Sequence, residues 1–155
     1  MDIVYRSLKL EHILLDLEGY VKLIDFGFSK YVKERTYTVC GVTEYIAPEI
    51  LLNQGHSTPV DWWAFGCLLY EMHAGHAPFV DDDPMWIYQK ILNAKPRYPD
   101  DFDYDLKSLV RHLLRRDLSK RYGSLTAGAG DIKNHRALAD INFQELLNKT
   151  LPAPY

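Results

Sequence analysis

Few of the reactive side chains in this sequence are spaced so that they form a recognisable site on their own. The two cysteines, Cys40 and Cys67, lie far apart, which supports neither a zinc site nor a disulfide framework. No metal-ligand spacing links the histidines His56, His73, His76 and His112. Asp61 is different because it stands at the start of an apolar stretch, where a carboxylate usually has a partner.

Three short segments carry a more specific signal through their order along the chain. They are Tyr5 to His12 (YRSLKLEH), Asp25-Phe26-Gly27 and Ala47-Pro48-Glu49. In this order and at this spacing they resemble the catalytic loop, the metal-binding loop and the end of the activation segment of eukaryotic protein kinases. The resemblance continues through Thr36 to Gly41, Glu44-Tyr45, Asp61 to Trp63, Asp117 to Gly123 and Asp131 to His135. It covers almost the whole chain and is greatest for the AGC group, which includes the cAMP-dependent protein kinases. Ala137-Leu138 departs from it by lacking an aromatic pair.

The resemblance implies ATP and Mg²⁺ as cofactors, but it also places substitutions at the catalytic centre. Ser7 stands where the family has the aspartate that accepts the substrate's hydroxyl proton, and a neutral hydroxyl offers no such base. His12 replaces an asparagine that binds Mg²⁺, an ion that prefers oxygen ligands. The other metal ligand, Asp25, and the lysine that neutralises the γ-phosphate, Lys9, are retained. We therefore expect no catalysis by this chain and poor binding of ATP and Mg²⁺.

The same resemblance predicts where a peptide would bind. Glu11 and Glu71 match acidic positions that, in the relatives, bind an arginine upstream of the phosphorylated residue. Tyr45 matches a tyrosine in the loop that receives the peptide. The alternative is that both carboxylates are ordinary surface groups without a ligand. Val42 replaces a threonine that ties the catalytic lysine and aspartate together, and Thr43 replaces a proline beside the substrate.

Thr38 is the candidate phosphorylation site, because it lies in a polar, aperiodic segment and the resemblance surrounds it with cations. The expected cationic cradle consists of Arg6, Lys30 and Arg35. An unmodified loop threonine is the alternative. In the relatives, positions matching Tyr37 and Val39 dock a regulatory subunit, so a protein partner of that kind, or a peptide substrate, is expected.

Structural positions of the family are better retained than catalytic ones. Glu49 and Arg121 match a buried ion pair that joins the activation segment to the later helices. Asp61 matches an acid that holds the backbone around Tyr5 and Arg6. These matches predict a kinase-like fold in a chain that lacks kinase chemistry.

Residues 1–155 are expected to form a partial protein kinase domain, from the catalytic loop to the end of the large (C-terminal) lobe. The family's glycine-rich loop, strand lysine and partner glutamate precede the catalytic loop, and this sequence holds no match to them. Three interpretations stay open: an active serine/threonine kinase, a pseudokinase that binds partners, and a truncated product with no role of its own.

The element that must position these residues is a helix over 59–74, which is apolar on nearly every face and is therefore expected to be buried. Thr58 is the predicted N-cap, Pro59 opens the helix and Gly75 ends it. The predicted packing residues are Trp62, Trp63, Phe65, Leu68, Leu69 and Met72. With fewer than the roughly 20 apolar residues that cross a bilayer, it is a core helix rather than a membrane span.

Other elements follow from turn and capping signals. A short strand is expected over 2–5, a hairpin over 12–15 and 20–24, and an exposed loop over 29–44. Helices are expected over 48–52, 84–93, 131–135 and 142–149, and around the periodic apolar residues Leu106, Leu109, Val110, Leu113 and Leu114. The predicted fold class is α+β and mostly α, with a small hairpin and a central buried helix.

Composition is consistent with one globular domain in a reducing compartment. The chain has 155 residues, 47% of them hydrophobic, and a net charge of −3. Neither value favours nucleic acid or an anionic membrane as a partner, and the basic cluster from Arg111 to Arg121 is interpreted as the solvated end of a helix. No signal peptide is visible after Met1, so a cytoplasmic location is expected.

Overall fold

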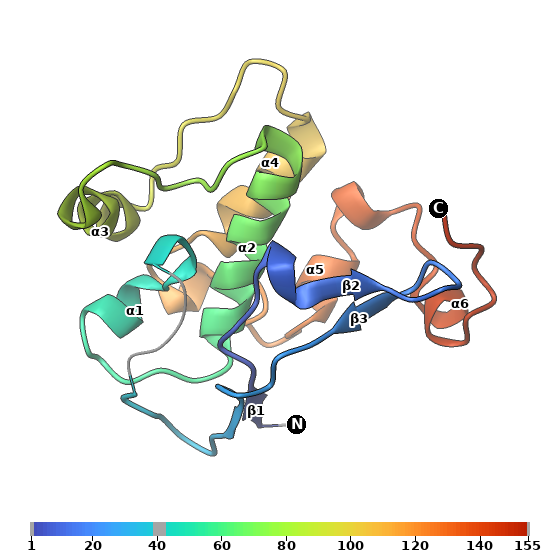
Figure 1. The fold of residues 1–155 in the computed structure, drawn as a ribbon, viewed down its shortest axis with the longest axis horizontal. Coiled ribbons are helices and arrows are strands. Elements are labelled where there is room, and N and C mark those ends of the chain that lie inside the picture. The colour runs from blue at the N-terminus through green and yellow to red at the C-terminus, as the bar shows by residue number, and fades with distance from the viewer. Residues whose placement is uncertain (1, 39–42, 155) are drawn as a thin grey trace.

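The computed structural model describes residues 2–38 and 43–154, and a long central helix organises them (Figure 1). This helix, α2, spans Pro59–Ala74 as the sequence predicted, and it ends at Gly75, whose φ of 76° is left-handed. Thr58 is at the N-cap position as predicted, but it has a helical backbone and makes no side-chain cap hydrogen bond. In the first turn of α2, the Asp61 carboxylate accepts hydrogen bonds from the backbone of Tyr5 and Arg6.

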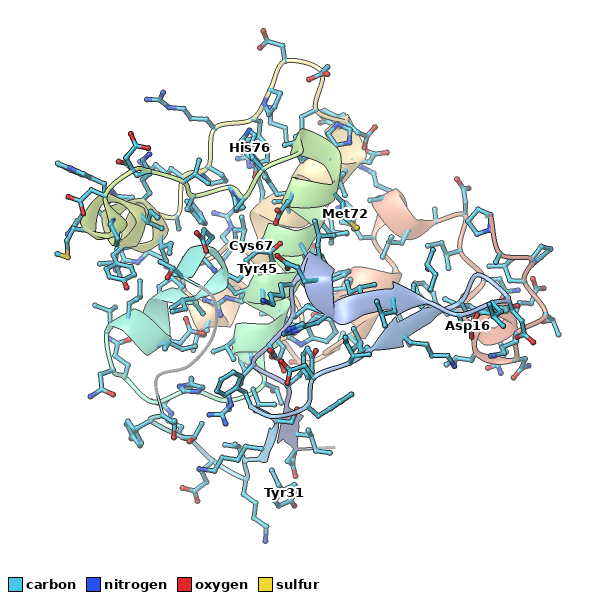
Figure 2. All side chains as sticks on the ribbon, viewed as in Figure 1. Asp16, Tyr31, Tyr45, Cys67, Met72 and His76 are labelled. Carbon is cyan, nitrogen blue, oxygen red and sulfur yellow. The ribbon has the colours of Figure 1, made fainter. Side chains whose placement is uncertain are left out.

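Burial along α2 is less complete than its apolar sequence suggested. Trp63 and Tyr70 are fully buried, whereas Trp62 and Phe65 are half-buried. The prediction that Met72 packs in the core is wrong, because its side chain is 56% exposed. Among the described residues, nothing covers that face of the last turn of α2, where Figure 2 shows Met72 at the surface.

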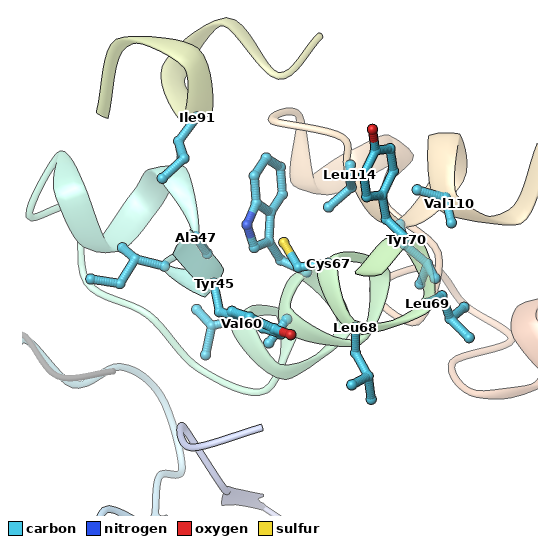
Figure 3. Close-up of a cluster of buried hydrophobic side chains, with 14 of the residues drawn as sticks. Tyr45, Ala47, Val60, Cys67, Leu68, Leu69, Tyr70, Ile91, Val110 and Leu114 are labelled. Carbon is cyan, nitrogen blue, oxygen red and sulfur yellow. The ribbon is translucent and has the colours of Figure 1, made fainter. Parts of the chain in front are cut away.

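The core lies between α2 and the helices α3, Pro84–Asn93, and α4, Tyr104–Leu113 (Figure 3). α4 buries the predicted apolar stripe, with Leu109, Val110 and Leu113 each 0% exposed. Gly66 permits the close approach of α2 and α4, since a Cβ there would lie 2.8 Å from the Cβ of Leu113. α3 begins as predicted, with the Asp83 carboxylate accepting a hydrogen bond from the backbone N–H of Met85.

Two small antiparallel sheets flank the helices. β2, Ile13–Leu15, pairs with β3, Val21–Leu23, as the predicted hairpin. β1, Ile3–Val4, pairs with β4, Lys30–Tyr31. β4 corrects the prediction of an exposed, irregular segment over 29–44. Val32 and Thr36 there are also buried, and Thr36 exchanges backbone hydrogen bonds with His56, because this segment folds back against the chain before α2.

Short helices complete the fold: α1 at Pro48–Leu51, α5 at Gly130–Lys133 and α6 at Phe143–Leu147. Near α6, the C-terminal segment packs on the hairpin turn, where the Tyr20 hydroxyl donates to the Leu151 carbonyl at 2.8 Å. The described chain is thus mostly helical α+β with two-stranded sheets, as predicted. No helix in the described ranges combines the length and the apolar character that a membrane crossing requires.

Candidate functional site

The central feature of the site is a contact that joins Ser7, His12 and Asp25. His12 Nδ1 lies 2.7 Å from the Ser7 carbonyl oxygen and 3.0 Å from its hydroxyl oxygen, and Nε2 lies 3.3 Å from Asp25 Oδ2. A 3₁₀ turn over Leu10–His12 folds the ring back over Ser7. The backbone N–H of Ile24 donates to the His12 carbonyl at 3.0 Å, which brings the next segment alongside. The two predicted loops therefore meet through His12.

The hydrogen-bond geometry determines what the imidazole can do. A backbone carbonyl only accepts hydrogen bonds, so the 2.7 Å contact requires a proton on Nδ1. Nε2 faces a carboxylate and donates to it when it also carries a proton. With Nδ1 donating, the ring has no free nitrogen beside the Ser7 hydroxyl that would accept its proton. Ser7 is also only 7% exposed, so this contact is not an activated serine nucleophile.

Asp25, the retained metal-ligand position, is occupied at both carboxylate oxygens. Its backbone has a left-handed φ of 55°, and its Oδ1 accepts the Gly27 N–H at 3.2 Å while Oδ2 faces His12. In sites of this kind Mg²⁺ is held by one or two carboxylates together with phosphate and water oxygens. Asp25 supplies one carboxylate here, whereas His12 faces it with an imidazole nitrogen, a poor ligand for Mg²⁺. The carboxylate therefore fits Mg²⁺, and the imidazole does not.

The predicted anchor Asp61 joins α2 to the segment before Ser7. Its Oδ2 accepts the Tyr5 N–H and its Oδ1 the Arg6 N–H, each at 2.8 Å. Burial raises the pKa of the Asp61 carboxyl, and these two hydrogen bonds oppose that shift. Arg6 has a strained, left-handed φ of 62°, which the two-point anchor helps to maintain. Lys9 is half-buried, and no acid in the described ranges lies within ion-pair distance of it.

Glu49 and Arg121 form a bidentate ion pair inside the protein. Arg121 Nη1 lies 2.6 Å from Glu49 Oε1 and Nη2 lies 3.0 Å from Oε2, and Arg121 is 0% exposed. The guanidinium also donates to the carbonyls of Pro59 and Arg115, at 3.1 Å and 2.8 Å. Four of the five guanidinium N–H donors are used, and this pair connects α1, the start of α2 and the segment after α4.

The residues predicted to bind a peptide gather around Tyr45. The Tyr45 hydroxyl donates to the Glu71 carboxylate on α2. Burial, and then the Glu71 contact, raise the pKa of Tyr45. Tyr45 itself is buried, whereas Glu71 is half-buried and Glu11 is exposed, so both carboxylates reach solvent.

The predicted cradle residues of Thr38 each make a contact elsewhere, although Arg6 Nη1 has no hydrogen-bond partner among the described residues. Thr38 is exposed, but Lys30 donates to the Thr36 hydroxyl at 3.1 Å and Arg35 donates to the Gln54 carbonyl at 2.9 Å. Arg6 Nε donates to the Phe28 carbonyl at 2.7 Å. The predicted roles of Val39 and Val42 fall on residues outside the described ranges. Thr43 begins a 3₁₀ turn that ends at Tyr45.

Sequence reasoning treated the substitutions at positions 7 and 12 separately and missed that they touch. Their spacing of five residues around a turn was the available signal. It also missed His56, which is 4% exposed and whose Nε2 has no hydrogen-bond partner among the described residues. Burial, and secondarily the nearby Arg6 charge, lower the pKa of His56.

Comparison with known proteins identifies relatives over nearly the full chain. The chain is 49% identical to the cAMP-dependent protein kinase catalytic subunit of Dictyostelium discoideum, with 99% of this chain and 24% of that protein covered. It is 46% identical to cAMP-dependent protein kinase type 3 of Saccharomyces cerevisiae, with 99% of this chain and 39% of that protein covered. It is also 46% identical to the human cAMP-dependent protein kinase catalytic subunit PRKX, with 99% of this chain and 43% of that protein covered.

The chain therefore spans less than half the length of these relatives. The family model described as the protein kinase domain matches residues 1–137. That match covers most of the chain, and it includes the loops that His12 joins as well as the Glu49–Arg121 pair. On this evidence, the chain belongs to the protein kinase family.

Proposed function

We propose that residues 1–155 form part of a kinase domain, the large-lobe segment, whose own residues do not support phosphoryl transfer. The supporting observation is the contact of His12 with Ser7 and Asp25. Ser7 supplies no carboxylate where the relatives place their base, and His12 engages the one retained metal-ligand position. The domain is thus a pseudokinase in its catalytic centre.

The magnitude of the defect follows from the missing groups. A positioned general base contributes about 10²- to 10⁴-fold to a rate. Positioning and metal electrostatics supply most of the remaining acceleration in phosphoryl transfer. Since Ser7 removes the first contribution and the His12–Asp25 contact impairs the second, the two losses compound. Lys9 is retained, but it can neutralise a γ-phosphate only if ATP is bound at this centre.

We further propose that the domain retains a peptide-binding or partner-binding role. Tyr45 donates to Glu71, and the half-buried Glu71 and the exposed Glu11 offer carboxylates to an arginine-containing segment. The relatives are catalytic subunits by name, and a partner resembling a regulatory subunit would dock here and on Tyr37, which is 60% exposed. We expect this function in the cytoplasm, with ATP and Mg²⁺ dispensable for it.

A chimera separates the catalytic defect from the absence of a matching upstream segment. The matching segment of the human relative PRKX is replaced by this chain, and phosphorylation of an arginine-containing serine peptide is measured with Mg-ATP. We expect no transfer above background, partial activity from Ser7→Asp, and more from Ser7→Asp with His12→Asn. The 155-residue chain alone is expected to stay inactive with either change.

A reciprocal experiment guards against a chimera that fails to fold. Serine and histidine are introduced into the intact relative at the positions matching Ser7 and His12, and activity should fall by at least about 10²-fold. A chimera that transfers phosphate at a rate near that of the relative, with the transfer abolished by Asp25→Ala, would refute the proposal.

A further inference from the structure

The surface formed by the C-terminal half of α4 and the turn that follows is strongly basic in a protein of net charge −3. Four cations gather on it: Lys107, Arg111, Arg115 and Arg116. Across residues 2–38 and 43–154, none of these four lies within 4.0 Å of a carboxylate. We name this group the α4 basic surface. The sequence suggested that this cluster was only the solvated end of a helix. In the structure it is a group of cations without carboxylate partners among the described residues.

The α4 basic surface is concave. Two adjacent hollows of about 410 and 490 Å³ share Arg111 and Arg115 in their walls. Lys107 lines the first hollow, whereas Tyr98 and Arg116 line the second. Arg111, Arg115 and Arg116 are exposed, so their guanidinium groups are accessible from solvent.

A polar group in the second hollow also lacks a partner. The Tyr98 hydroxyl is buried and has no hydrogen-bond partner in the described part of the chain. Burial raises the pKa of Tyr98, although the Arg111 and Arg115 charges oppose this, so the group stays a protonated O–H donor. The Lys107 ammonium lies 4.9 Å from the centre of the same ring. The Lys107 ammonium is therefore held over the Tyr98 ring, whereas the hydroxyl is closed off from solvent.

The nearby acids are already engaged and do not neutralise this surface. Asp117 pairs with Lys120 at 3.1 Å and accepts the Ser119 N–H. Asp105, also on α4, pairs with Arg136. The opposite face of α4 is anchored in the core by its leucines, so the spacing of the cations is fixed by a rigid helix.

We propose that the α4 basic surface binds an extended peptide segment of a partner protein in which aspartate or glutamate occupies every second position. Lys107 and Arg111 are one helical turn apart, about 6 Å along the axis. Alternate side chains of an extended peptide recur at roughly 6.6 Å on one face, so successive carboxylates meet successive cations. Guanidinium groups suit this role because they bind carboxylates bidentately. This proposal does not depend on the catalytic centre.

The other anionic partners fit less well. Nucleic-acid-binding domains have a basic charge balance, typically with a pI above about 9, whereas this chain has a pI near 6.0. A membrane surface is flat on the scale of these hollows, so it would contact only their rims. An extended acidic peptide can enter the hollows and meet Lys107, Arg111 and Arg115 in their walls.

The test uses the 155-residue chain and a fluorescein-labelled (Glu-Ser)₄ peptide, followed by fluorescence anisotropy at two salt concentrations. We expect saturable binding that weakens with salt. Arg111→Gln with Arg115→Gln should weaken it by about tenfold or more. The matched control, Lys33→Gln with Lys133→Gln, removes the same charge from cations outside the surface and should change affinity less than about twofold. Tyr98→Phe, which removes only a hydroxyl that is closed off from solvent, should change affinity less than about twofold.

Two further ligands complete the design, and circular dichroism checks that each variant is folded. A (Lys-Ser)₄ peptide should not bind. A single-stranded oligonucleotide and vesicles containing phosphatidylserine should bind more weakly than the acidic peptide. The proposal is refuted if the acidic peptide does not bind, if both double variants weaken binding equally, or if the oligonucleotide or vesicles bind more tightly through the same arginines.

Discussion

The buried ion pair between Arg121 and Glu49 offers the sharpest test of how this fold is held together. Arg121→Met removes a guanidinium that is 0% exposed and donates to Glu49 and to the carbonyls of Pro59 and Arg115. The loss leaves a buried carboxylate and two carbonyls without that donor. Glu49→Leu leaves a buried cation that keeps both carbonyls and the face of Trp63, 5.2 Å from its central carbon.

The expected magnitudes follow from this asymmetry. Breaking a buried pair from one side costs about 3 to 5 kcal/mol, a large share of a typical unfolding free energy of about 5 to 15 kcal/mol. Arg121→Met should lie at the upper end, because each unsatisfied carbonyl adds a further penalty, and Glu49→Leu at the lower end. The double variant should cost no more than Arg121→Met alone, since it leaves no unpaired charge.

Urea unfolding followed by tryptophan fluorescence measures these differences, and Trp63 beneath Arg121 acts as a local reporter. Arg116→Met is the matched control, because this exposed arginine lies in the same segment and should change stability by about 0.5 kcal/mol or less. The reasoning is refuted if Arg121→Met costs less than about 1 kcal/mol, or if the two single changes add in the double variant.

Three further outcomes are expected. The hairpin partners Leu15 and Val21 are 57% and 61% exposed, so the chain should self-associate. Leu15→Lys with Val21→Thr should lower the mass measured by light scattering, whereas the control Leu52→Lys should not. A parent chain that is already monomeric contradicts this. Phosphate placed on Thr38 by an added kinase should slow protease cleavage between positions 35 and 44 by drawing Arg35 toward it, and unchanged cleavage argues against that docking. The lowered pKa of His56 means that the unfolded chain takes up a proton below about pH 6.5 while the folded chain resists it. The melting temperature should therefore fall between pH 7.5 and 5.5, less steeply in His56→Gln; equal slopes would exclude His56 as a cause.

Local signals in the sequence were sufficient for the main helices and for family membership. α2 and α3 have the predicted bounds because proline at the start, glycine or a polar cap at an end, and apolar side chains between them act within a few residues. The apolar period of α4 identified its buried face for the same reason. The short motifs also identified the family, because their order is a property of the chain itself.

Contacts between distant residues depended on the path of the chain. Thr58 is at the N-cap position without a side-chain cap hydrogen bond, and Asp61 accepts hydrogen bonds from backbone groups 55 and 56 residues away. Met72 is exposed because burial depends on which elements reach a face, not on the hydrophobicity of the residue.

In the candidate site, too, the residue types follow from the sequence, whereas the contacts between them depend on the fold. The residue types at positions 7, 12 and 25 were readable, so the absence of a carboxylate at position 7 followed from the sequence alone. Only the folded chain decides that the His12 ring lies between Ser7 and Asp25, since a turn and a loop crossing bring them together. The tertiary structure likewise brings Tyr98 beside Arg111 and Arg115. Side chains separated in sequence act together only when packing makes them neighbours at a few ångströms, where hydrogen bonds and unscreened charge operate.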